Sequence, residues 1–209
     1  MAENVAPSRT RRLWLVHRLD WARRSLELLE RKRQILMVEH ERLGKRLERA
    51  RINWAVAARE ARDRGLRAAA LAGASDLALA ASAVETTEID LPWAELAGTR
   101  FPSEPNLRMP AFPATYAAAA SASVPPAVEA YRKAIVAAAE HAAAEAAFGV
   151  VDKQLAATKR RHRAIEGHRI PALEAELHFV VLRLDELERE QQVVNRWARD
   201  ATKRGQSAL

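Results

Sequence analysis

The sequence predicts an all-α protein whose N-terminal and C-terminal arms form a long antiparallel, left-handed two-helix coiled coil, joined by an irregular middle insert. Near both ends of the 209-residue chain, apolar residues recur at alternating spacings of four and three, which is the repeat of a left-handed coiled coil. Aromatic residues make up only 5% of the chain, too few to build a large round core. Seven of the nine prolines lie between the two repeats.

The first arm is predicted to span residues 8–83. Its repeat defines a seam, the line of a and d positions that face the partner helix. Arg33 and His40 interrupt this seam, either to fix register and orientation or because the helix is loosened there. The apolar seam residues of this arm include Leu15, Leu19, Leu26, Leu29, Leu36, Leu43 and Leu47.

The second arm is predicted to span residues 127–204, and it supplies the partner that the first seam requires. Pro171 lies inside this arm. Because proline lacks an amide hydrogen, the helix is expected to kink or slip between Gly167 and Pro171. The seam residues of this arm are Leu173, Leu177, Val180, Leu184, Leu187 and Val194.

The middle insert, residues 84–126, differs in composition from the arms. Residues 89–91 and 100–101 flank a stretch containing Gly98, a pattern compatible with a short β-hairpin. The uncharged stretch 109–128 contains four prolines and is not expected to cross a bilayer. Nor does the start resemble a signal peptide, so we expect a cytoplasmic protein without direct membrane insertion.

Motifs that carry catalysis are missing from the sequence. There is no cysteine, and no glycine-rich phosphate loop. The histidines form no zinc-binding motif, and no serine lies in a nucleophile elbow. Pairs such as His162 and Glu166 are expected to be surface hydrogen bonds. We therefore predict a protein that is not an enzyme, with no catalytic residues, cofactor or metal.

The net charge of +7 is unevenly distributed, since residues 8–67 contain 18 basic and 8 acidic side chains. Acidic residues are interspersed among these arginines and lysines, whereas a nucleic-acid surface gathers its positive charge on one stripe. No nucleic-acid partner is therefore expected. Trp14, Trp21 and Trp197 either anchor a protein partner or pack within the coiled coil.

Short motifs at both ends resemble the D subunit of the V-type and A-type rotary ATPases. Residues 5–9 read V-A-P-S-R and residues 28–33 read L-L-E-R-K-R. Near the other end, residues 170–174 read I-P-A-L-E and residues 184–190 read L-D-E-L-E-R-E. Each motif is common in coiled coils, but their order and their distances from the two ends are similar to those of the family.

This resemblance implies a central-stalk rotor subunit that is peripheral to the membrane. Its implied partners are the catalytic and non-catalytic nucleotide-binding subunits of a hexameric ring, a small stalk subunit of the F type, and a funnel-shaped subunit on the membrane rotor. Alternatives are the stalk protein of a flagellar or secretion export ATPase, or a non-enzymatic coiled-coil scaffold. The tip inside the ring would comprise residues 8–32 and 185–204. Its candidate contacts are Arg11, Arg12, Arg18, Arg23, Arg24, Arg189, Arg196 and Arg199.

Overall fold

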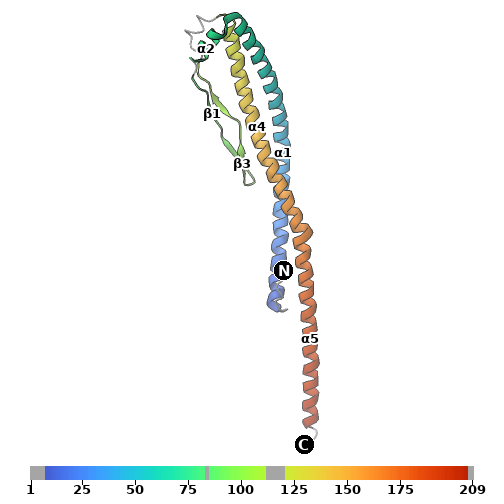
Figure 1. Ribbon diagram of the computed structural model, residues 1–209. Coiled ribbons are helices and arrows are strands. Elements are labelled where there is room, and N and C mark those ends of the chain that lie inside the picture. Colours follow the sequence, from blue (N-terminus) through green and yellow to red (C-terminus); the bar gives the residue numbers. More distant parts are fainter. Residues whose placement is uncertain (1–7, 83–84, 112–120, 207–209) are drawn as a thin grey trace. The chain divides into compact units, whose positions relative to one another are not determined.

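The computed structural model describes residues 8–82, 85–111 and 121–206 and is mostly helical, with short antiparallel strands in the middle (Figure 1), which confirms the prediction of a helical protein. The chain divides into a terminal unit, Met1–Arg31 with Thr158–Leu209, and a middle unit, Lys32–Ala157. The helices are α1 (Arg9–Ala72), α2 (Ala74–Ser82), α4 (Val124–Ala164), a π-helical turn η1 (Ile165–Arg169) and α5 (Ile170–Gln206). The strands are β1 (Glu88–Asp90), β2 (Trp93–Leu96), β3 (Thr99–Pro102) and β4 (Asn106–Arg108).

In the terminal unit, α1 and α5 pack against each other through aliphatic side chains. Leu15 and Leu19 of α1 form a buried cluster with Leu173 and Val180 of α5. Such clusters remove apolar surface from water, at about 25 cal/mol per Å². Leu177 and Leu184 pack at its margin. Over this cluster, the apolar side chains of each helix are thus covered by the other helix.

Ion pairs show that α1 and α5 run antiparallel. Arg9 contacts Glu188 and Arg23 contacts Glu174, each at 2.8 Å between guanidinium nitrogen and carboxylate oxygen. Fourteen residues toward the C-terminus of α1 therefore correspond to fourteen residues toward the N-terminus of α5. The left-handed supercoil of this pair stays a prediction.

Helix α5 continues beyond the start of α1, as Figure 1 shows. Because α1 begins at Arg9, beside Glu188, it offers no surface to the last turns of α5. Val194 of the predicted seam lies in this end and is 65% exposed, and Leu187, level with the first turn of α1, is 45% exposed.

The slip expected near Pro171 takes the form of the π-helical turn η1. The backbone N–H of Ile170 donates to the carbonyl oxygen of Ile165, five residues back. Pro171 cannot donate the next bond, and its ring excludes the carbonyl four residues earlier from its usual place. A wide turn directly before the proline accommodates both effects, so the helical path continues through it.

In the middle unit, small side chains bring α1 and α4 close together. An added Cβ on Gly65 would lie 2.6 Å from the Tyr131 hydroxyl, and one on Gly44 would lie 3.4 Å from the Phe148 ring. Helix separation depends on the side chains at the contact, and alanines here occupy buried positions. These are Ala50, Ala61 and Ala68 on α1, and Ala127, Ala130, Ala137, Ala143, Ala144 and Ala147 on α4.

The predicted hairpin is confirmed, although its partners differ from the expected ones. Strands β2 and β3 pair through a two-residue turn, with Phe101 opposite Ala94. Ile89 pairs instead with Leu107, because β1 and β4 form a second two-stranded ladder. Both turn residues are left-handed, with φ of 51° at Ala97 and 68° at Gly98, as a type I′ turn requires.

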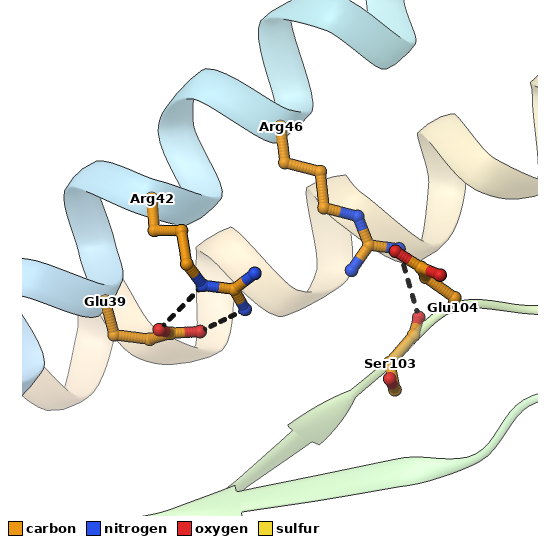
Figure 2. A network of polar contacts seen from close by, with 5 residues as sticks. All are labelled: Glu39, Arg42, Arg46, Ser103 and Glu104. Atoms are coloured by element: carbon orange, nitrogen blue, oxygen red, sulfur yellow. Dashed lines mark hydrogen bonds and ion pairs between the residues drawn. The ribbon is translucent and has the colours of Figure 1, made fainter.

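The hairpin is attached to the helices by one aromatic anchor and one arginine. Phe101, 4% exposed, packs into a core that includes Leu36 and Leu43 of α1. Arg46 of α1 donates to the Ser103 carbonyl oxygen at 3.5 Å and lies 4.0 Å from the Glu104 carboxylate (Figure 2). Burial of Phe101 dominates this attachment, since exposed ion pairs contribute at most about 1 kcal/mol.

Candidate functional site

Some of the arginines predicted to contact a partner are already held by carboxylates within the chain. Arg11 forms an ion pair with Glu176 on α5, and Arg23 forms one with Glu174. Arg24 contacts Asp20 of its own helix at 2.8 Å. These pairs orient the side chains and neutralise part of their charge. A partner would have to compete for these guanidinium groups.

The remaining predicted contact arginines are exposed and form no ion pair within the described part of the chain. Their guanidinium groups are therefore open to an external carboxylate, for which the planar fork of arginine is well suited. Three of them lie on the end of α5 that extends past α1. The open residues are Arg12, Arg18, Arg189, Arg196 and Arg199.

The end of α5 also exposes apolar side chains. Val193, Val194 and Trp197 are 52%, 65% and 75% exposed. Tryptophan and arginine are enriched where protein interfaces carry most of their binding energy. Sequence spacing placed Val194 in the seam, whereas the structure shows that α1 does not cover it.

His40, a polar residue of the predicted seam, has partners inside the middle unit. The Nε2 atom of His40 lies 3.0 Å from Oδ1 of Asp152 on α4, and its ring lies 4.5 Å from that of Phe148. Trp54 stacks on His141 at 5.1 Å between ring centroids while remaining 41% exposed. These contacts cross from α1 to α4, so they favour one register of the two helices.

In the terminal unit, His162 lies between two carboxylates. Its Nε2 atom is 3.5 Å from Glu30 on α1 and its Nδ1 atom is 3.4 Å from Glu166 in η1. The spacing of His162 and Glu166 predicted only the local pair. The contact with Glu30 depends on the pairing of the helices, which spacing along one helix cannot reveal.

Among the described residues, the shifted pKa values belong to charged pairs on the surface of α1. Hydrogen bonds from Lys45 and Arg51 lower the pKa values of Glu41 and Glu48, and a hydrogen bond to Glu39 raises the pKa of Arg42. These are helix-surface pairs with opposite charges three or four residues apart. Within the described ranges, no group of three or more His, Cys, Asp or Glu side chains is placed to hold a metal.

Among the described residues, one helical segment is long and apolar enough to cross a membrane, judged by length and composition alone. Within 124–199, an 18-residue window has a mean hydropathy of 1.4 and is 33% buried. A buried helix of a soluble protein meets the same test.

The structure defines a protein of long helices in which α1 packs against both α4 and α5. The family model for the D subunit of ATP synthase matches residues 13–200. The chain therefore belongs to this ATP synthase family, which confirms the resemblance at the two ends. Membership supports a stalk subunit of a rotary ATPase, and hence a place in a membrane-associated ATP synthase complex. A comparison with curated proteins gives no match.

Proposed function

We propose that this chain is the central rotor subunit of a V/A-type ATPase, where it couples ATP hydrolysis or synthesis in a hexameric ring to ion transport across the membrane. The observation that carries the proposal is the family match over residues 13–200. The antiparallel packing of α1 and α5 supports it, because a torque-bearing element needs two helices that resist twisting together. The same match favours a rotor over an export-ATPase stalk or a general scaffold.

The proposed tip consists of residues 8–32 and 185–204 and lies inside the ring. A rotor must favour one ring conformation at a time without remaining bound to it. Exposed ion pairs suit this task, since each contributes at most about 1 kcal/mol and can exchange between equivalent partners. Arg189, Arg196 and Arg199 are the tip arginines best placed for such contacts, because α1 does not cover this end of α5.

The proposed partners at the other contacts are a small stalk subunit of the F type and a funnel-shaped subunit on the membrane rotor. The middle unit offers the hairpin for such binding. Its packing around Leu36, Leu43 and Phe101 keeps the hairpin in place. Rigid attachment matters because slack between rotor subunits would dissipate torque.

Copurification tests the assignment. The full chain, tagged at its C-terminus and expressed with the neighbouring ATPase genes, should bring down a nucleotide-binding hexamer and a small stalk subunit. Purification of the chain alone, from cells in which the other subunits are assembled, would refute the proposal.

A second experiment tests the tip arginines. The triple variant Arg189→Gln, Arg196→Gln and Arg199→Gln should assemble but lower ATP-driven ion transport per ATP hydrolysed. The matched control neutralises Arg49, Arg59 and Arg67, exposed arginines of the middle unit, and should leave coupling unchanged. Normal coupling in the tip variant would remove the role assigned to these residues.

A further inference from the structure

A groove in the terminal unit combines aromatic and cationic side chains. It has a volume of about 510 Å³ and lies between α1 and the π-helical turn η1. Trp14, Arg18 and Trp21 line it from α1, and Ile165 and Arg169 line it from η1. An open groove of this kind suits a protein segment, whereas small-molecule sites are usually enclosed.

Helical spacing explains why these residues share one face. Trp14, Arg18 and Trp21 are separated by four and three residues, so they form a stripe along α1. The stripe lies one residue before Leu15, Leu19 and Ala22, which pack toward α5. The groove therefore borders the α1–α5 contact. On the other side, η1 widens the helix and presents Ile165 and Arg169 together, and π-turns are often found at functional sites.

The two tryptophans are unusually exposed for their size. Trp14 is 43% exposed and Trp21 is 74% exposed. Neighbouring exposed indoles leave a large apolar area in water, and such patches mark interaction sites more often than isolated apolar residues do. Tryptophan is also the residue type that most often dominates binding energy when a partner covers it.

The charge of the groove is positive and uncompensated. Arg18 and Arg169 form no ion pair with any described residue, and no carboxylate side chain lines the groove. The guanidinium carbons of Arg11 and Arg18 lie 4.4 Å and 5.3 Å from the centre of the Trp14 ring. These cation–π contacts hold the indole and the guanidinium groups together. The groove is thus complementary to carboxylates next to an apolar side chain.

We infer that this groove binds an acidic protein segment of one nucleotide-binding ring subunit, which inserts an apolar side chain between Trp14 and Trp21 and places carboxylates on Arg18 and Arg169. The inference rests on the proposed function, which brings the α1 side of the groove, within residues 8–32, into the ring. Each chain carries this groove once, so one ring subunit occupies it at a time. The groove then distinguishes that subunit from its equivalent neighbours.

Binding of the full chain to the purified hexamer of ring subunits tests the inference. The variant Trp14→Ala with Trp21→Ala should bind at least about tenfold more weakly. The variant Arg18→Gln with Arg169→Gln should bind about tenfold more weakly and lose part of the salt dependence of binding. Matched controls are Trp93→Ala, which removes a tryptophan that is 59% exposed in the hairpin, and Arg59→Gln with Arg67→Gln. Neither control should change affinity more than about twofold.

The outcomes separate the groove from the proposed function. If the wild-type chain binds the hexamer and both groove variants bind equally well, the groove inference fails while the rotor assignment stands. If the wild-type chain does not bind the hexamer, both fail. If a single-stranded oligonucleotide quenches the groove tryptophans and competes with the hexamer at lower concentrations than the hexamer requires, the groove is a nucleic-acid surface and the inference is wrong. Unchanged thermal melting of the variants shows that binding, and not folding, was altered.

Discussion

Replacing Gly65 with alanine should reveal how closely α1 and α4 approach each other. In an exposed helix interior, replacing glycine with alanine stabilises the helix by about 1 kcal/mol. Here the new Cβ would lie 2.6 Å from the Tyr131 hydroxyl and 3.0 Å from its Cε2 atom, so the ring must move away. Tyr131 is 49% exposed, and losing its remaining burial, about 100 Å² of aromatic surface, costs about 2 kcal/mol. The net effect is a destabilisation of about 1 kcal/mol.

The effect of Gly65→Ala on the unfolding free energy should change sign when Tyr131 is absent. In a Tyr131→Ala background, Gly65→Ala should stabilise by about 1 kcal/mol, which gives a coupling energy of about 2 kcal/mol in a double-mutant cycle. Urea unfolding followed by circular dichroism measures each free energy. Gly149→Ala is the matched control, because no atom lies within 4 Å of its added Cβ, and it should stabilise equally in both backgrounds. Equal stabilisation by Gly65→Ala in both backgrounds would show that the helices are not this close.

Other parts of the fold allow similar tests. Leu43→Ala removes a side chain that is 0% exposed and should lower the unfolding free energy by about 2–5 kcal/mol, whereas Leu28→Ala, at a residue that is 63% exposed, should change it by less than about 0.5 kcal/mol in the same urea titration. Ala97→Asn should slow hydrogen exchange in the hairpin, because asparagine tolerates the left-handed φ of 51° better than alanine. Lys45→Gln should raise the pKa of Glu41 toward its ordinary 4.5 in an NMR titration, since the hydrogen bond from Lys45 lowers it. The stabilisation from this pair is present above pH 4.5 and is lost as pH falls through the lowered pKa, so an unshifted pKa in the variant would contradict the pair.

The long helices were predictable because their apolar residues repeat at one spacing over many turns. Leu15 and Leu43 lie on that repeat, and the structure buries both completely. The end of α1 was not predicted. Gly73 stops the helix at Ala72 by adopting a φ of 85°, a common helix terminator, yet the apolar pattern continues past it.

The hairpin was harder to predict because its strands are short and weakly patterned. Ala97 gave no signal for a type I′ turn, in which asparagine or glycine is usual. The pairing of Ile89 with Leu107 is a longer-range contact, and local spacing does not specify such partners. Phe101 was placed near a strand, but its burial against Leu36 and Leu43 depends on the folded middle unit.

The candidate binding surfaces were predictable only in their residue types. Counting arginines identified the basic end of the chain, but sorting paired from unpaired guanidinium groups required the partners on α5. The groove could not be predicted from local sequence, because it brings Arg169 of η1 together with Trp14 and Trp21 of α1, two segments distant in sequence. The sequence had marked Trp14, Trp21 and Arg18 as candidate contacts, and Pro171 predicted the disturbance that became η1.

The apolar repeat of α5 extends farther than the helix that covers it. Leu184 packs beside the α1–α5 cluster, whereas Leu187 and Val194, which continue the same spacing, are exposed. An isolated two-helix protein gains nothing from continuing a seam beyond its partner, because exposed apolar residues contribute no burial. In a rotor tip the same residues would be covered by the ring, beside the exchangeable contacts of Arg189, Arg196 and Arg199. The end of α5 therefore presents apolar and basic side chains side by side, which is the surface that the proposed contact with the ring requires.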